Sequence, residues 1–260
     1  MSSTDKYTAE TITELHTWTP NLFSFKTTRD QGYRFVPGQF ARLGVRTVTS
    51  EGDEMVWRAY SIVSAHYDEY LEFYSIVVPN GKFTSQLSKL NVGDKIYIER
   101  KSLGFLTTDR FEMGKDLWML STGTGLAPFI SILYDFKTWE AYENLVLVHS
   151  VRVEDELAYQ EVIRNFKQSE YFAEFSSRLH YVQAVTRETV PNTLNARITD
   201  LIETGELERT VGFPIDHDRS RIMICGNPEM VDETRELLTK RGLTISRRGA
   251  PGHLAVENYW

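Results

Sequence analysis

The sequence predicts two domains: an antiparallel six-stranded β-barrel, followed by an α/β domain with a doubly wound parallel sheet. The first observation is a series of short alternating, β-branched or aromatic runs separated by turn residues in residues 1–110. The second is the change of pattern after residues 108–115, where buried-type strands begin to alternate with amphipathic helices. The third is a length of 260 residues with 41% hydrophobic and 25% charged side chains, which suits two modest globular domains. We therefore expect domains at residues 1–110 and 111–260.

The expected strands of the first domain share alternation or a high content of β-branched and aromatic residues. They span residues 7–15, 22–28, 39–45, 56–65, 71–78 and 95–99. A short helix is expected from the Pro79-Asn80-Gly81 turn to about residue 90, with Thr84 and Ser85 as candidate N-caps. The free amides of its first turn favour an anion, although a simple connecting helix explains the segment as well.

The second domain alternates β and α elements. Strands are expected at residues 116–121, 144–150, 179–186 and 221–225. Helices are expected from the turn after the first strand to about residue 136, and at residues 154–166, 194–203 and 228–241. Because such a sheet is parallel, its ligand site is expected at the carboxyl ends of the strands.

The run Arg58-Ala59-Tyr60-Ser61 ends the strand expected at residues 56–65. Alternation along a strand places Arg58 and Tyr60 on one side, and Ala59 and Ser61 on the other. A guanidinium, a phenol ring and a small hydroxyl suit a large, flat, anionic ligand, since the guanidinium can bind a diphosphate. The alternative is an exposed strand with an ordinary arginine and a half-buried tyrosine.

The turn at residues 122–128, TGTGLAP, follows a strand and opens a helix, as a phosphate-binding turn does. It reads G-x-G-x-x-P, so it lacks the third glycine of the dinucleotide fingerprint, and a purely structural turn is an equal alternative. Arg152, Arg187 and Arg197 lie near the ends of the next strands and on the following helix. Three arginines there favour a 2′-phosphate, and hence NADP over NAD, although surface arginines are common.

Composition excludes several classes of function. The net charge of −7, all of it in residues 111–260, argues against general nucleic-acid binding. The single cysteine excludes an intrachain disulfide and an all-cysteine metal or iron–sulfur site, and one thiol is consistent with a cytoplasmic protein. The N-terminus is no signal peptide, and no apolar run approaches a membrane span. His149, His180 and His253 are interpreted as packing residues, and no metal site is expected.

Four motifs together resemble one family. RAYS at residues 58–61, GKFT at 81–84, STGTGLAP at 121–128 and CGNP at 225–228 occur in this order, and the chain ends in Asn-Tyr-Trp. With the barrel-then-parallel-sheet layout, they resemble a bacterial-type ferredoxin (flavodoxin)–NADP⁺ reductase over essentially the whole chain. The Tyr-Trp end resembles the enterobacterial branch.

The resemblance implies that residues 1–110 bind FAD and that residues 111–260 bind NADP(H), with the C-terminal tail returning to the flavin. The FAD contacts implied are Arg58, Ala59, Tyr60, Ser61, Tyr74, Ser75, Ile76, Lys82, Phe83, Thr84, Ser85, Thr124, Tyr259 and Trp260. The NADP contacts implied are Arg152, Arg187, Arg197 and Asn227. Ser61, Cys225 and Glu257 are candidate catalytic residues: Ser61 for a bond to flavin N5, and the other two for the nicotinamide pocket.

The implied activity is an exchange of electrons between NADPH and a one-electron carrier, ferredoxin or flavodoxin, by a monomeric cytoplasmic enzyme. An acidic carrier would need a local cationic patch. The candidates are the cluster Lys240, Arg241, Arg247 and Arg248 late in the chain, and Lys82, Lys89, Lys95, Arg100 and Lys101 in the first half. One alternative is a related flavoreductase that feeds an oxygenase or reduces quinone or free flavin. A second is a non-catalytic FAD-binding module that senses redox state.

Overall fold

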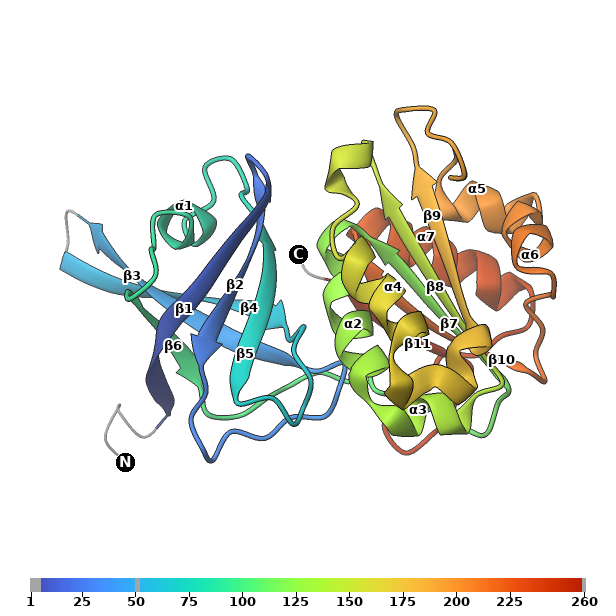
Figure 1. Ribbon diagram of the computed structural model, residues 1–260, viewed down its shortest axis with the longest axis horizontal. Helices are drawn as coiled ribbons and strands as arrows, with labels where there is room; N and C mark the ends of the chain where they lie inside the picture. The colour runs from blue at the N-terminus through green and yellow to red at the C-terminus, as the bar shows by residue number, and fades with distance from the viewer. Residues whose placement is uncertain (1–5, 50–51, 259–260) are drawn as a thin grey trace.

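The computed structural model describes residues 6–49 and 52–258. Figure 1 shows two parts side by side: a curled sheet formed by the first part of the chain and an α/β layer structure formed by the second. This arrangement confirms the predicted fold class.

The described residues of the first part form an antiparallel sheet of six strands in the order β4-β3-β6-β1-β2-β5. The strands are β1 (Tyr7–Thr19), β2 (Leu22–Thr28), β3 (Phe40–Thr49), β4 (Gly52–Ser61), β5 (Tyr70–Ile76) and β6 (Lys95–Glu99). The sheet curls until its two edge strands meet at a bridge between Ile62 and Phe73. Alternate side chains point inward, and Phe25, Leu43 and Ile96 fill the interior. All six predicted strands are therefore present.

Two local predictions in the first part are wrong. The helix expected as far as residue 90 is the single turn α1 (Thr84–Leu87), and its N-cap is Phe83, with no side-chain cap. Thr84 cannot cap this turn because its hydroxyl is already bonded to the amide (3.1 Å) and the carbonyl (3.2 Å) of Val78. Ser85 lies inside the turn, and its hydroxyl donates to the carbonyl of Lys82 at 3.4 Å.

The second part has a parallel sheet, whose described strands run in the order β11-β10-β7-β8-β9. Their bounds are Asp116–Thr122 for β7, Asn144–Val151 for β8, Leu179–Val185 for β9, Ser220–Gly226 for β10 and Leu254–Asn258 for β11. The chain runs from β7 outward to β9 and then returns to place β10 on the other side of β7. The strand order therefore reverses between β7 and β10, where a doubly wound sheet opens a ligand crevice.

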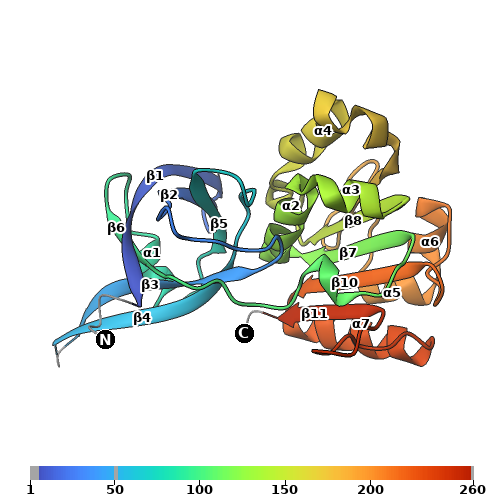
Figure 2. The same ribbon diagram turned by 90° about the horizontal axis from the view of Figure 1, so that it is seen from below.

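Helices cover both faces of the parallel sheet, as Figure 2 shows. On one face lie α2 (Ala127–Tyr134), α3 (Phe136–Ala141) and α4 (Gln160–Gln168), with the 3₁₀ segment η5 (Glu170–Arg178) after them. On the other lie α5 (Ile198–Glu203) and α7 (Pro228–Lys240), and α6 (Glu206–Val211) stands beside α5. The remaining 3₁₀ turns are η2 (Thr108–Arg110), η3 (Gly123–Leu126) and η4 (Glu154–Glu156).

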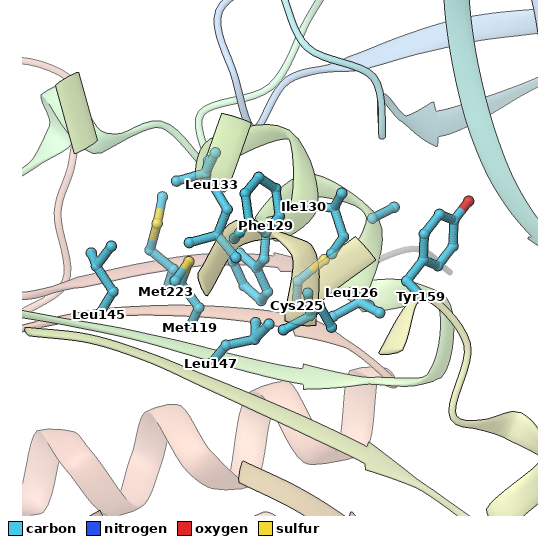
Figure 3. Close-up of a cluster of buried hydrophobic side chains, with 14 of the residues drawn as sticks. Met119, Leu126, Phe129, Ile130, Leu133, Leu145, Leu147, Tyr159, Met223 and Cys225 are labelled. Atoms are coloured by element: carbon cyan, nitrogen blue, oxygen red, sulfur yellow. The ribbon is translucent and has the colours of Figure 1, made fainter. Parts of the chain in front are cut away.

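The hydrophobic core of the α2–α4 face continues into the barrel. Figure 3 shows its centre, where Phe129 and Leu133 from α2 lie above Met119, Leu147 and Met223 of the strands. Leu22, Val63 and Leu106 from the first part belong to the same buried cluster. Burial of apolar surface across the junction therefore holds the two parts together.

Several elements of the second part differ from expectation. The sequence predicts only a tail where β11 lies. This strand pairs with β10 in parallel register, which places Glu257 beside Cys225. The helix expected at residues 194–203 begins only at Ile198, because Leu194 bridges to Ala184 and the side-chain Nδ2 of Asn195 donates to the carbonyl of Val185. α3 and α6 were also not predicted.

Candidate functional site

A cavity of about 400 Å³ lies between the ends of β4 and β5 and the turn before α1. It is lined by Arg58, Ala59, Tyr60, Ser61, Tyr74, Ser75, Ile76, Val78, Gly81, Lys82, Phe83, Thr84, Thr124 and Ala127. Apart from Ser85, every predicted FAD contact among the described residues lines it. Val78, Gly81 and Ala127 are additional, although Gly81 and Ala127 belong to motifs that the sequence singled out.

All four residues of the Arg58–Ser61 run line this cavity, although their side chains alternate. The reason is that β4 is an edge strand of the sheet. Among the described strands β4 pairs only with β3, so the residues of its free side can line the cavity.

Tyr60 is held by β5 and by the turn that follows it. Its hydroxyl is bonded to Ser75 Oγ at 2.9 Å, and its ring lies 5.5 Å from that of Phe83. Burial raises the pKa of Tyr60 to about 12, so the phenol is neutral at physiological pH. The ring therefore offers the cavity a fixed, uncharged, flat surface.

The hydroxyl of Tyr74 also favours a polar ligand in this cavity. Tyr74 is 2% exposed and lines the cavity, and its hydroxyl has no hydrogen-bond partner among the residues that the structure describes. Burial raises the pKa of this phenol well above its usual range, so it keeps its proton as a donor. Because an unsatisfied buried hydroxyl is costly, this atom fits a polar ligand. Arg58 and Lys82 add positive charge to the same cavity, and the residues present therefore fit FAD.

A second cavity, of about 710 Å³, lies at the carboxyl ends of the parallel strands. Its lining includes Thr122, Gly123 and Thr124 after β7, and Gly226 and Asn227 after β10. These turns touch because two glycines have no side chain. A Cβ on Gly125 would lie 2.3 Å from the carbonyl oxygen of Cys225, and one on Gly226 would lie 2.1 Å from Thr122 Oγ1. Both glycines are thus required for the turns to line the crevice.

Arg152, Arg187 and Arg197 all line the second cavity. Arg152 and Arg187 follow neighbouring strands, and the amide of Arg187 donates to the carbonyl of Arg152 at 2.8 Å. Arg197 pairs with Glu229 at 3.5 Å and with Glu233 at 3.9 Å. The cavity therefore has three cations that can bind a phosphate, and the charge of Arg197 is partly neutralised.

Asn227 lines the cavity, but its side chain also acts as the N-cap of α7. Its Oδ1 accepts from the amides of Glu229 (2.9 Å) and Met230 (3.3 Å). Its backbone amide donates to Thr122 Oγ1 at 2.9 Å and so joins the two turns. Glu156 and Glu229, two further lining residues, were not identified from sequence, because isolated surface glutamates carry no motif.

Ile76 and Thr124 line both cavities, so the two spaces adjoin. Ile76 ends β5 and Thr124 lies in the turn after β7. A ligand in one cavity can therefore contact a ligand in the other.

The three candidate catalytic residues occupy different positions. Ser61 is buried and lines the first cavity, whereas Cys225 and Glu257 line neither. Cys225 lies under the turn after β7, against Gly125. Glu257 accepts a bond from the backbone amide of Phe105, and burial raises its pKa to about 7. Their roles stay predictions.

The three histidines expected to have packing roles each have a hydrogen-bond partner within the protein. Nδ1 of buried His149 lies 3.2 Å from the Tyr181 hydroxyl, and burial lowers its pKa to about 3. His180 bonds Asn144 at 3.3 Å, and His253 accepts from the amide of Thr244 at 3.0 Å. Across residues 6–49 and 52–258, no group of three or more metal-ligating side chains occurs, and no helix has the length and apolar character needed to cross a membrane. The predicted contacts Tyr259 and Trp260 lie outside the described residues.

The two parts of the chain match two protein families. Residues 11–103 match the oxidoreductase FAD-binding domain family, and residues 119–236 match the oxidoreductase NAD-binding domain family. The chain therefore contains an FAD-binding domain and a nicotinamide-nucleotide-binding domain.

Similar proteins span almost the same length. A ferredoxin–NADP reductase of Azotobacter vinelandii is 46% identical over 252 residues, which cover 95% of each chain. A flavodoxin/ferredoxin–NADP reductase of Escherichia coli is 38% identical over 250 residues, covering 96% of this chain and 97% of the relative. The crystal structure of a ferredoxin NADP⁺ reductase from Neisseria gonorrhoeae with bound FAD and NADP superimposes with a TM-score of 0.89 at 34% identity, over 98% of this chain and 99% of that one. The adjoining cavities, the paired domains and these full-length likenesses together show that the chain belongs to the ferredoxin–NADP reductase family.

Proposed function

We propose that this chain exchanges electrons between NADPH and a one-electron carrier, ferredoxin or flavodoxin, with FAD in the cavity of β4 and β5. NADPH occupies the cavity at the carboxyl ends of the parallel strands. FAD, when bound, supplies the chemistry by accepting a hydride from NADPH and releasing electrons singly. The observation that supports this function best is that Ile76 and Thr124 line both cavities, so that the two cofactors meet.

In the FAD cavity, the charged residues and the tyrosines serve different parts of the cofactor. Arg58 and Lys82 bind the diphosphate, Tyr60 and Tyr74 hold the ring system, and Ser61 donates to flavin N5. Ala59, Ser75, Ile76, Phe83, Thr84 and Thr124 complete the lining, and Ser85 acts only through the turn that contains Lys82. The sequence resemblance alone supports the placement of Tyr259 and Trp260 over FAD.

In the NADP cavity, Arg152, Arg187 and Arg197 bind the 2′-phosphate and adenosine, and Asn227 shapes the turn beneath them. Cys225 and Glu257 line neither cavity, so they would act on the nicotinamide only where it extends from the NADP cavity toward the ends of β10 and β11. The paired positions of these two residues on β10 and β11 support this role. A nicotinamide that entered between the two parts of the chain would reach the flavin ring beside Ser61.

We further propose that the division between the domains lies at residues 110 and 111, and that the enzyme is a cytoplasmic monomer.

The cationic patch suggested for carrier docking has fewer unpaired cations in this structure than the sequence predicts. Lys240 pairs with Glu236 at 2.8 Å, and Arg241 pairs with Glu208 at 3.0 Å. Arg247 and Arg248 are exposed and remain the candidates from that cluster.

The test is the NADPH-dependent reduction of ferredoxin and of flavodoxin by the FAD-loaded protein, followed by the absorbance of each carrier. Both carriers are compared with NADH as donor. Reduction of at least one carrier, much faster with NADPH than with NADH, is expected. Failure of both carriers alongside rapid reduction of quinone or free flavin would instead favour the related flavoreductase function.

A further inference from the structure

Tyr159 has an unusual backbone conformation at the start of α4. Its φ is 58°, in the left-handed region, and the other described non-glycine residues with positive φ are both asparagines. Asparagine tolerates this region, whereas an aromatic residue there costs on the order of 1–3 kcal/mol. The contacts of the Tyr159 side chain must therefore hold the backbone in place.

Those contacts are made with the barrel. The Tyr159 hydroxyl donates to Glu72 Oε1 on β5 at 2.7 Å. The ring lies 4.9 Å from that of Trp18 on β1 and stands perpendicular to that of Tyr74 on β5, at 5.2 Å. Tyr159 is 3% exposed, and in Figure 3 its hydroxyl points away from the other labelled side chains of the core. A residue of the NADP domain is thus seated on the FAD domain.

The contact between Tyr159 and the barrel connects the two cavities, because the residues on either side of it line different cavities. Tyr74, against which the ring packs, lines the FAD cavity. Tyr159 ends a tight segment that begins at Arg152, and both Arg152 and Glu156 line the NADP cavity. The segment is stiff, because the Arg152 amide donates to Glu156 Oε2 at 3.0 Å and the Leu157 amide donates to the carbonyl of Glu154 at 2.9 Å.

We propose that Tyr159 is a positioning residue: its bond to Glu72 fixes the segment 152–159, and with it the bound nicotinamide nucleotide, relative to the flavin. This inference rests on the proposed function and adds a residue that contacts neither substrate. Tyr159 would act on the geometry of hydride transfer to the flavin. A reacting pair of atoms must lie about 3–3.5 Å apart, and a misplacement of about 1 Å can slow a reaction about 100-fold.

The partly buried carboxylate of Glu72 makes the contact depend on the single hydroxyl of Tyr159. Glu72 is half-buried, burial raises its pKa, and the Tyr159 hydroxyl counteracts that shift. Without this hydroxyl, a largely desolvated carboxylate would lose its short hydrogen bond, which favours entry of water and separation of the surfaces.

The test compares Tyr159→Phe with the matched control Tyr67→Phe. Tyr67 also carries a hydroxyl that crosses between the two parts, to the carbonyl of Tyr134 at 3.4 Å, but it is 62% exposed. Hydrogen exchange of the protein without nucleotide reports the contact itself. The dissociation constant of 2′-AMP reports the arginine end of the NADP cavity, and the rate of flavin reduction in a single turnover at saturating NADPH reports positioning.

Tyr159→Phe should speed hydrogen exchange in both β5 and residues 152–160, slow flavin reduction about tenfold, and leave 2′-AMP affinity within about twofold; the tenfold change corresponds to about 1.4 kcal/mol. Tyr67→Phe should change none of the three. Glu72→Gln, which keeps an acceptor oxygen, should stay near wild type, and Glu72→Leu should behave like Tyr159→Phe.

Unchanged exchange and an unchanged rate in Tyr159→Phe would overturn the inference. The inference would also be overturned if 2′-AMP binding weakened by the same factor as flavin reduction slowed. Tyr159 would then act only on the local fold of residues 152–159. Wild-type protein that fails to reduce flavin with NADPH contradicts the proposed function, and the exchange measurement then still decides whether Tyr159 joins the two parts.

Discussion

The buried carboxyl of Glu257 makes a specific prediction about stability and pH. Burial raises its pKa from 4.5 to about 7, and the amide of Phe105 offsets this only in part. Folding therefore favours the protonated form, and stability is lost as the pH rises from 4.5 through 7. The full loss of stability is about 3 kcal/mol, because each unit of pKa difference between the folded and the unfolded chain is worth about 1.4 kcal/mol.

Glu257→Gln removes this titration while it keeps an oxygen that accepts from Phe105. Between about pH 5 and about pH 8, the free energy of unfolding of wild type should fall by about 2.5 kcal/mol more than that of the variant. With roughly 2–4 °C per kcal/mol for a chain of this size, the difference in Tm between the two proteins should change by roughly 5–10 °C over that range.

The assay is thermal unfolding across this pH range, with and without added FAD. Glu54→Gln, a change at an exposed glutamate of β4, is the control and should follow wild type. Parallel pH profiles of wild type and Glu257→Gln would refute the reasoning, because they would mean that the carboxyl titrates alike in the folded and unfolded chains.

Three further changes follow from the cavity geometry. Glu229→Gln removes a carboxylate 3.5 Å from Arg197, so 2′-AMP should bind about twofold to fivefold tighter, while 5′-AMP is unchanged in the same titration. Equal gains for both nucleotides would contradict this. Gly226→Ala forces a Cβ to 2.1 Å from Thr122 Oγ1 at a φ of +141°, and chemical denaturation should show a loss of at least about 2 kcal/mol; wild-type stability would refute the close approach. Tyr60→Phe removes the bond to β5, so the FAD dissociation constant should rise about threefold to tenfold, measured by flavin fluorescence; an unchanged constant would mean that the hydroxyl does not position the ring.

The sequence predicted the elements whose signal is local. Strand alternation identified all six barrel strands, and the change of period identified the parallel sheet. The RAYS run was also recognisable, because arginine, tyrosine and serine at the end of a strand combine three ligand-binding groups. The fold class and the residues that mark the two cavities were therefore predictable from local sequence patterns.

Features set by tertiary contacts were not predictable. The polar pattern around Thr84 resembles a cap, but its hydroxyl is bonded to Val78 instead, across a turn that only the folded chain forms. β11 is a strand because β10 offers it a free edge, and its five residues carry little periodicity of their own. Tyr159 belongs to no motif, and its importance rests on Glu72, which lies far away in sequence.

Anaerobic titration of the purified, FAD-loaded protein with NADPH and with NADH tests the central claim most directly. Both titrations follow the visible flavin absorbance to its end point. The account predicts a yellow protein that NADPH bleaches at far lower concentration than NADH, because Arg152, Arg187 and Arg197 face the NADP cavity. Equal bleaching by both would contradict the role of the arginines, and a protein that cannot be loaded with FAD would contradict the whole account.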